Sequence, residues 1–522
     1  MPRTRRRHFI QGSLGISAAA LFSNLFARRA SASAYGDLVP DPNGVLDLPE
    51  GFSYVVLQEA GDAMSDGYVV PARPDGMACF ELADGNWSLM RNHEVSRGDE
   101  ASGAYSADAV PKEAYDPDGY GGVTRVVIDP SSGEVVSSNL VLAGTFRNCA
   151  GGPSPWGWLS CEENVEDNHG YVFACPEDAE AVVPAEPILG FGRFNHEAAA
   201  VDPATLVTYL TEDRGDGCFY RHVPDSKDTP FEGRLQALRI VDTDAFETAP
   251  LGKVGEMFDI EWVDVEEPNP ADDDIRYAAQ ALGASVFIRG EGLWYFDGEV
   301  YFSCTNGGPA GLGQIFRVID NGDTGTLELI AVSDSGDTLD FPDNITVAPW
   351  GELFIAEDGS GDQYVRFIDA DGSICDFARN AISDSELAGV CFSPDGTAMF
   401  VNIQGDGLTL MVTGPFPVDD GGGSTGGDTS GGADDSSGGG SDSNASTSDG
   451  ASASGTTGEP PTSDSDAATS GSDTDGDSAG GAGGGGGGCS VDGDNASGAV
   501  GLGAAALAAA VLRLPSDADA DE

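Results

Sequence analysis

Basic residues and histidines are scarce in this chain. The 522 residues include 25 Lys and Arg against 87 Asp and Glu, which gives a formal net charge of −62. This charge excludes a basic nucleic-acid-binding stripe as the main functional surface. It fits either a solvated, salt-tolerant surface or a protein that binds cations. Only five histidines are present, one of them His8 near the N-terminus, so a histidine-rich zinc site is not expected.

Long segments with helical apolar periodicity are also absent from the central part of the chain, residues 35–418. Short β-rich runs occupy it instead, at residues 123–128, 206–210, 293–303, 353–356 and 399–403. Turn sequences such as Asp297-Gly298 adjoin or interrupt these runs. Many short strands with regular turns indicate an all-β sandwich, barrel or propeller.

A weak repeat favours the propeller among these folds. Pro349-Trp350-Gly351 and Pro394-Asp395-Gly396 each precede an apolar strand, and their glycines lie 45 residues apart. Propeller blades are about 40 to 50 residues long, so residues 35–418 would hold roughly six or seven of them. The alternative is coincidence, because Pro-x-Gly turns are common in all-β proteins. In a propeller, strand ends from every blade meet at the central channel, so ligands from distant parts of the chain can converge there.

The N-terminal 34 residues predict an export signal. Arg5-Arg6-Arg7-His8-Phe9-Ile10 is a twin-arginine pattern, and an apolar stretch of small residues follows it. Ala30-Ser31-Ala32 then offers a cleavage site. We interpret residues 1–34 as a Tat signal peptide, which predicts a protein of the periplasm or cell surface.

The C-terminal 104 residues predict no folded domain. Residues 419–488 are almost entirely Gly, Ser, Asp, Thr and Ala, a composition that cannot form a core and indicates a disordered, self-repelling linker. In residues 489–522, Cys489 precedes an apolar stretch that ends near Arg513. This segment resembles the sorting segments of myxobacterial surface proteins, which predicts attachment to a membrane or cell surface. The alternative is a chance apolar patch, since the stretch is short for a membrane span.

Acidic motifs stand at the ends of several predicted strands. They are Arg91–Glu94, Cys161–Glu163, Asn195–Glu197, Thr211–Arg214, Arg289–Gly292, Asp343–Asn344 and Glu357–Gly359. Carboxylates beside buried apolar runs are unfavourable unless they are paired or bind a metal. Seven such motifs predict a shared cation cluster, although turn caps and surface ion pairs are the alternative. Carboxylate and amide oxygens suit calcium, and a carboxylate-rich site can also hold ferric iron.

Asn148-Cys149-Ala150-Gly151-Gly152 is a different kind of motif. Its glycine pair predicts a tight turn in which the backbone can approach a ligand. Cys149 is either a metal ligand in that turn or a buried free thiol. The nine cysteines of an exported chain permit disulfides, but their scattered spacing predicts no pairing.

Several motifs together resemble the PhoX-type alkaline phosphatases. They are Arg147–Gly152, Trp158–Glu163, Gly192–Glu197, Thr211–Arg214, Arg289–Gly292, Thr305–Gly308, Pro342–Asn344 and Ala388–Gly396. The resemblance extends over about residues 91–416. It implies a six-bladed propeller whose channel holds ferric and calcium ions (Fe³⁺ and Ca²⁺). It also implies hydrolysis of phosphomonoesters at alkaline pH.

The same resemblance implies roles for individual residues. Arg289 would bind the phosphate and stabilise charge in the transition state, and Cys149 and Glu291 would join it as catalytic residues. The implied metal ligands are Cys149, Glu163, Glu197, Glu212, Glu291, Asp343, Asn344 and Glu357. One residue that we expect between Gly157 and Trp158 in the family is absent here, and this shortening bears on the spacing of Cys149 and Glu163.

Two other functions remain open from the sequence. A calcium-dependent lactonase or esterase on a similar propeller would not need the thiolate of Cys149. A non-catalytic calcium-binding surface propeller would bind no iron and hydrolyse nothing. The leading hypothesis is a phosphatase that acts as a monomer on small phosphomonoesters and does not bind nucleic acid.

Overall fold

A computed structural model describes residues 35–417, which form β-sheets with little helix. The predicted signal peptide (1–34), linker (419–488) and C-terminal segment (489–522) lie outside the described residues. The helical elements are α2 (Ile275–Ala281) and the 3-10 turns η1 (Glu100–Ser102), η2 (Ala107–Ala109) and η3 (Leu189–Phe191). No helix within residues 35–417 has the length and apolar character needed to cross a membrane.

Five antiparallel sheets account for the strands of residues 35–417. The first contains β4 (Pro74–Glu81), β5 (Trp87–His93), β6 (Gly121–Asp129) and β7 (Glu134–Thr145). The second contains β8 (Asn148–Ser154), β9 (Gly157–Glu162) and β10 (Val172–Cys175). The third contains β11 (His196–Val201), β12 (Thr208–Glu212), β13 (Phe219–Ser226), β14 (Thr229–Ile240), β15 (Glu256–Asp264), β16 (Gly290–Phe296), β17 (Glu299–Cys304), β18 (Gln314–Asp320) and β19 (Thr324–Val332).

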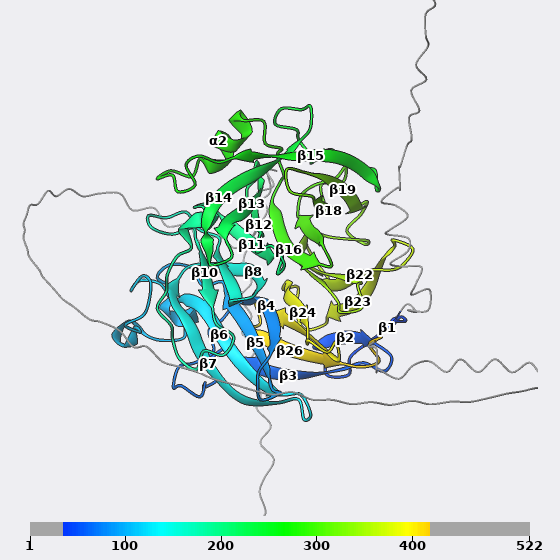
Figure 1. Ribbon diagram of the computed structural model, residues 1–522. Coiled ribbons are helices and arrows are strands. Elements are labelled where there is room, and N and C mark those ends of the chain that lie inside the picture. The colour runs from blue at the N-terminus through cyan, green and yellow to red at the C-terminus, as the bar shows by residue number, and fades with distance from the viewer. Residues whose placement is uncertain (1–34, 418–522) are drawn as a thin grey trace, which may run out of the picture. The chain divides into compact units, whose positions relative to one another are not determined.

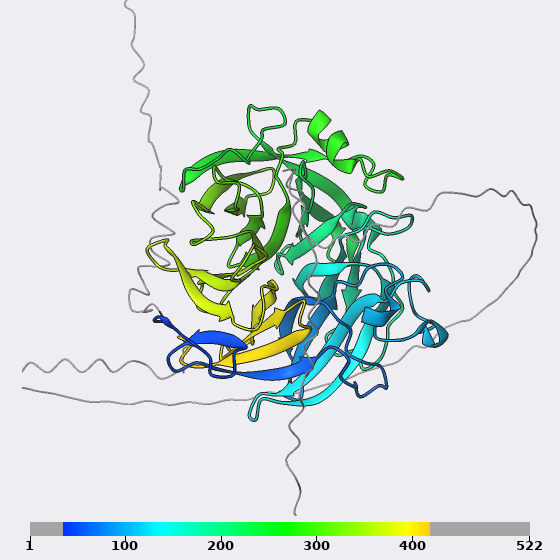
Figure 2. The same cartoon turned by 180° about the vertical axis from the view of Figure 1, so that it is seen from behind.

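The last two sheets combine strands from both ends of the described chain. One contains β1 (Leu38–Val39), β2 (Leu46–Pro49), β20 (Pro342–Val347), β21 (Leu353–Glu357), β22 (Tyr364–Ile368) and β23 (Ile374–Asn380). The other contains β24 (Leu387–Phe392), β25 (Ala398–Ile403), β26 (Leu408–Thr413) and β3 (Ser53–Glu59). Because β3 pairs with β26 and β2 pairs with β23, the N-terminal strands close the structure against the C-terminal ones. Figure 2 shows this closure, with the blue strands beside the yellow ones.

Six strands form a closed ring at the centre of the structure. In order they are β4, β8, β11, β16, β20 and β24, and each contacts the next, with β24 returning to β4. Figure 1 shows five of them, β4, β8, β11, β16 and β24, grouped around the middle of the molecule. A cavity of about 20 Å³ is lined by residues of all six strands, including Gly76, Ala150, Ala198, Gly292, Asn344 and Gly389. The ring therefore encloses a narrow central space.

The nine-stranded sheet consists of two four-stranded halves joined through β15. This strand pairs with β14 of one half and with β19 of the other, and Figure 1 shows it along the outer edge. The burial of a strand depends on whether it lies toward the inside or the outside of its sheet. Strand β25 is buried along its whole length, whereas exposure alternates along β19. This difference is expected because an inner strand packs on both faces and an outer strand on one.

The sequence-based fold prediction is confirmed at the level of an all-β, propeller-like arrangement. The predicted short runs lie in β6, β12, β16–β17, β21 and β25. The two Pro-x-Gly turns connect β20 to β21 and β24 to β25, so they occupy the same place in consecutive sheets. The prediction of a tight turn at Gly151-Gly152 was wrong, because both glycines lie within β8. Gly152 is needed there for packing, since a Cβ would lie 1.7 Å from the carbonyl oxygen of Ala199 in β11.

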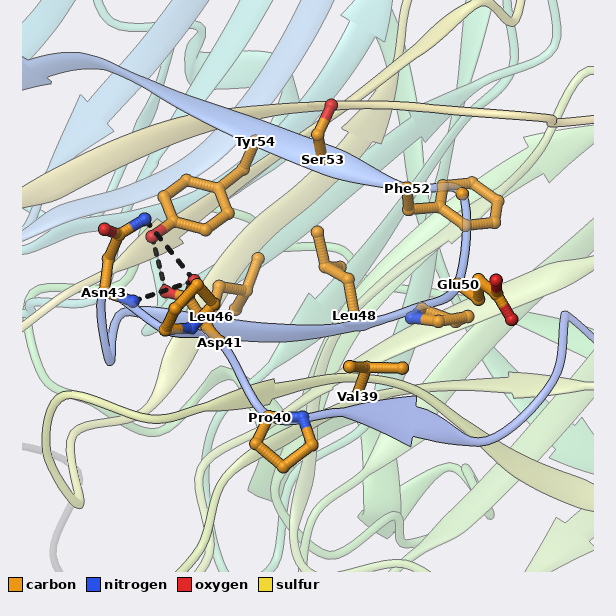
Figure 3. Close-up of a pocket in the computed structure, with 13 residues that line it drawn as sticks. Val39, Pro40, Asp41, Asn43, Leu46, Leu48, Glu50, Phe52, Ser53 and Tyr54 are labelled. Carbon is orange, nitrogen blue, oxygen red and sulfur yellow. Dashed lines mark hydrogen bonds between the residues drawn. The ribbon is translucent and has the colours of Figure 1, made fainter.

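The N-terminal segment forms a pocket of about 400 Å³ beside β1, β2 and β3. Figure 3 shows Asp41 next to Asn43 and Tyr54 at one end of this pocket. The carboxylate of Asp41 accepts hydrogen bonds from the Tyr54 hydroxyl at 2.6 Å and from the Asn43 backbone N–H at 3.1 Å. These bonds fix the turn that leads into β2. The pocket shares no residue with the central site described below.

Candidate metal centre

Each of the six central strands has an irregularity close to its start. After the first paired residues, two residues of the central strand oppose a single residue of the neighbouring strand. A bulge of this kind redirects a side chain. The residues at this bulge position are Asp75, Cys149, Glu197, Glu291, Asp343 and, in β24, Gly389. The fold thus repeats one ligand-bearing position around the ring, and five of its six occupants can bind a metal.

A second repeated position lies where the neighbouring strand of each pair ends. The residue at this exit position donates its backbone N–H to the carbonyl of the residue just before the central strand, which we call the pre-strand position. The exit residues are Glu94, Glu163, Asp213, Thr305, Asp358 and Gln404, with N–O distances of 2.9 to 3.3 Å. Their pre-strand partners are Arg73, Arg147, Asn195, Arg289, Phe341 and Glu386. The bond holds each exit residue beside a bulge residue.

The bulge and exit positions together build one acidic cluster. It comprises Cys149 and the carboxylates of Asp75, Glu94, Glu163, Glu197, Asp213, Glu291, Asp343, Asp358 and Glu386. Glu386 is the one carboxylate from neither position, and it precedes β24. In each of two groups of residues, the ligand atoms lie within 4.8 Å of one another. The first group is Cys149, Glu163 and Glu197, and the second is Glu197, Glu291 and Asp343. Glu197 belongs to both groups and links them.

Burial gives the cluster unusual electrostatics. Glu197 and Glu291 are each 2% exposed, and Cys149 is 4% exposed. Burial, followed by repulsion from neighbouring carboxylates, raises the pKa of Glu197 and of Asp343 well above the usual range. Burial also raises the pKa of the Cys149 thiol. So many buried acids are stable in their ionised form only when positive charge lies among them.

Two arginines lie at the edge of this cluster. Arg289 donates from Nε and Nη2 to the Asp213 carboxylate, at 2.9 and 3.3 Å, and from Nη2 to Glu291 at 2.8 Å. Arg147 pairs in the same way with Glu94 and Glu163. The arginine side chains are 18% and 28% exposed, whereas each of these carboxylate partners is at most 9% exposed. The guanidinium groups are therefore the more accessible side of the cluster.

The structure brings most of the sequence-predicted site residues together. The cluster and its edge include Cys149, Glu163, Glu197, Glu291, Asp343 and Arg289. Asn344 lies next to it, where its Oδ1 accepts the backbone N–H of Gly389 and its Nδ2 donates to Asp343 at 3.2 Å. The shortened hairpin before Trp158 does not separate Glu163 from Cys149, since both belong to the first ligand group.

Glu212 and Glu357 lie elsewhere. Glu212 accepts the Tyr220 hydroxyl at 2.8 Å and is 3.5 Å from Arg276, away from the ligand groups. Glu357 accepts Arg366 Nε at 2.9 Å. Burial raises the pKa of both carboxyls to about 7. Their role as metal ligands stays a prediction, but the residues after them, Asp213 and Asp358, are the ones that lie in the acidic cluster.

Sequence reasoning gave no individual role to several residues of the cluster and its edge. These are Asp75, Glu94, Asp213, Asp358, Glu386 and Arg147. Of these, Glu94, Asp213 and Asp358 lie in the acidic motifs that predict a cation cluster. Two signals in the sequence could have found some of them. Pro74-Asp75-Gly76 parallels Pro342-Asp343-Asn344, and both open a central strand. The pairs Glu212-Asp213 and Glu357-Asp358 end a strand as Glu162-Glu163 does, so the second residue of each pair takes the same position.

Fold and site together define a propeller-like β-protein with a central cluster of candidate metal-binding residues. The chain matches the family model described as alkaline phosphatase PhoX over residues 33–140 and 134–407. It therefore belongs to the PhoX alkaline phosphatase family, whose members depend on metals.

The fold is similar to that of a solved structure. The Pseudomonas fluorescens PhoX structure with vanadate, a transition-state analogue, is similar with a TM-score of 0.58 and 19% identity. The match covers 73% of this chain and 98% of that one. A gluconolactonase from Xanthomonas campestris is less similar, with a TM-score of 0.39 and 14% identity over 74% of this chain and 99% of that one. No curated protein sequence matches the chain.

Proposed function

We propose that this chain is an exported phosphatase that hydrolyses phosphomonoesters at a calcium and iron cluster in the channel of a six-bladed propeller. Family membership supports phosphatase chemistry on small phosphate esters. The ring of six central strands supports six blades, two of which would share the nine-stranded sheet. The twin-arginine pattern in residues 1–34 supports export to the periplasm or cell surface.

The residues of the acidic cluster fit metal cations. Within the acidic cluster, Glu197 Oε2 and Asp75 Oδ1 are buried oxygens without a hydrogen-bond partner. A buried carboxylate oxygen without a donor is costly, and a cation would satisfy it. The convergence of three ligand atoms within 4.8 Å around Glu197, twice over, is the observation that carries the proposal.

The donor set differs between the two sides of the cluster. Cys149 supplies a sulfur next to Glu163 and Glu197, a set that suits iron. The side with Asp75, Glu386 and Asp343 offers only oxygens, which calcium prefers. When bound, such ions would provide Lewis acidity toward a phosphoryl group and would activate an oxygen nucleophile.

Arg289 would bind and orient the substrate phosphate. Its planar fork matches two phosphate oxygens, and phosphoryl transfer gathers negative charge on those oxygens. Asp213 and Glu291 hold the guanidinium in place from the buried side. Because an arginine stays charged at alkaline pH, this contact would persist under the conditions that the family resemblance implies.

The test combines metal analysis with turnover. The full chain, purified and supplied with calcium and iron, should hydrolyse p-nitrophenyl phosphate and should retain both metals. Cys149→Ala should lose iron and activity, and Arg289→Ala should lose activity while it keeps both metals.

Cys175→Ala is the matched control, because it removes another buried thiol from β10, outside the acidic cluster. It should keep iron and activity. A wild-type protein that retains calcium without iron and hydrolyses no phosphomonoester would contradict the proposal. It would favour the non-catalytic calcium-binding alternative.

A further inference from the structure

Three arginines occupy the same pre-strand position in different sheets. Arg73, Arg147 and Arg289 each precede a central strand, and their φ angles are 49°, 46° and 48°. A non-glycine residue in this left-handed region is strained by about 1 kcal/mol or more. In all three, the carbonyl accepts the backbone N–H of an exit residue. The three side chains therefore extend from equivalent backbone positions around the acidic cluster.

Arg73 differs from the other two in its partners. Arg147 and Arg289 pair with buried carboxylates, as described above. Every other arginine of residues 35–417 also has a hydrogen bond or an ion pair, but the structure records neither for the side chain of Arg73. That side chain is exposed. In a chain with 87 acidic residues, an arginine without an ion pair beside an acidic cluster indicates a site for an external anion.

The position of Arg73 separates it from the phosphate site at Arg289. It precedes β4, which lies between β24 and β8 in the ring, whereas Arg289 precedes β16 on the other side. The cluster carboxylate within electrostatic reach of Arg73 is Glu386, just before β24. One anionic group held at Arg289 thus leaves Arg73 available for a second group of the same molecule.

We propose that Arg73 binds a second anionic group of the substrate, a carboxylate or another phosphate. This inference rests on the proposed phosphatase function and names its substrate class: phosphomonoesters with a second negative charge on the leaving group. The net charge of −62 does not exclude such substrates. Salt at physiological strength screens charges beyond about 8 Å, while the contact with Arg73 is direct.

The test uses two substrates that differ in one group. Glycerol 3-phosphate carries a hydroxymethyl group where 3-phosphoglycerate carries a carboxylate. With the full chain in calcium and iron, Arg73→Gln should raise KM for 3-phosphoglycerate about tenfold, the loss expected for one hydrogen bond between charged groups. The KM for glycerol 3-phosphate should rise much less, kcat should change little for either substrate, and Arg73→Lys should restore part of the loss.

Arg234→Gln is the matched control, since Arg234 is a surface arginine on β14 with a side chain that is 60% exposed. It removes the same charge and should alter neither KM. An equal effect of Arg73→Gln on both substrates, or on neither, would overturn the inference. An equal effect of Arg234→Gln would overturn it too, because the cause would then be the overall charge.

Calorimetric binding of the same two compounds separates this inference from the proposed function. If wild type binds 3-phosphoglycerate more tightly than glycerol 3-phosphate, and Arg73→Gln abolishes the difference, the second anion site stands even without hydrolysis. In that case only the phosphatase proposal fails. If turnover is normal but the variant binds both compounds as wild type does, only the second anion site fails.

Discussion

Glu212 and Asp213 are neighbours in sequence, and we expect their substitutions to have different consequences. Asp213 follows β12 at an exit position and holds Arg289 through two hydrogen bonds. Glu212, one residue earlier, points to Tyr220 and Arg276. Because alternate residues of a strand face opposite sides, Asp213→Asn should impair the site and Glu212→Gln should impair the fold.

The expected magnitudes follow from the partners that each residue has. Asp213→Asn removes the charge from a bidentate ion pair, and hydrogen bonds between charged groups contribute about 1.5 to 3 kcal/mol. If that energy positions Arg289 for the phosphate, kcat/KM falls roughly ten- to hundredfold. Glu212→Gln weakens a contact with Arg276, which keeps Asp216 and Asp273 as partners. A loss of about 1 to 3 kcal/mol in unfolding free energy is expected there.

Steady-state kinetics with p-nitrophenyl phosphate and urea unfolding of the same preparations measure the two effects. Asp213→Asn should lose activity at nearly normal stability, and Glu212→Gln should lose stability at nearly normal activity. The reverse pattern would refute this reasoning and would make Glu212 a metal ligand, as the family resemblance implies. Iron and calcium analysis of both variants would then show which ion depends on Glu212.

Two further predictions concern stability. His222 lies buried in β13 with no partner for either ring nitrogen, and burial lowers its pKa to about 4. Its folded pKa is below the unfolded value, so the unfolded state takes up a proton first and stability falls as pH drops below about 6.5. Between pH 7 and pH 5 this loss is about 2 kcal/mol, and His222→Leu should abolish it in urea unfolding; an unchanged pH dependence would contradict the assignment. Gly389→Ala should destabilise by well over 1 kcal/mol, because φ is +65° and a Cβ would lie 2.2 Å from the Asp75 carbonyl oxygen. Gly298→Ala is its control, with φ of +88° and open space around the Cβ, and equal losses in both variants would show that the contact with Asp75 is unimportant.

Local sequence patterns predicted the fold because its elements are local. Strand β21 begins with a continuous apolar run, and β6 contains the β-branched run Val126-Val127-Ile128. Such short runs identify buried strands regardless of what they pack against. The repeated Pro-x-Gly turns mark equivalent hairpins, so their spacing carries the period of the whole ring. The closure of the structure by β3 could not be predicted in this way. Strand β3 pairs with β26, which is distant in sequence, and no local pattern encodes that pairing.

The site was only partly predictable for a related reason. Acidic motifs at strand ends identified the right segments, but the choice between adjacent carboxylates depends on which side of the strand each one faces. Of the pair Glu162-Glu163, the selected Glu163 lies in the cluster. Of the pair Glu357-Asp358, the cluster contains Asp358, whereas sequence reasoning selected Glu357. Glu386 was not found this way, because it occupies neither the bulge nor the exit position. It is the pre-strand residue of β24, and none of the other five pre-strand residues is an acid.

The departures from the repeat explain why the centre is asymmetric. A regular ring would offer six equal bulge positions, but β24 has Gly389, where the Asp75 carbonyl leaves no room for a side chain. The exit positions after β17 and β25 have Thr305 and Gln404 instead of acids. Carboxylates are therefore missing at three places in the repeat, and Cys149 takes the place of one at a fourth. The fold therefore supplies equivalent positions, and the different residues at them give the ring an unequal distribution of donor atoms.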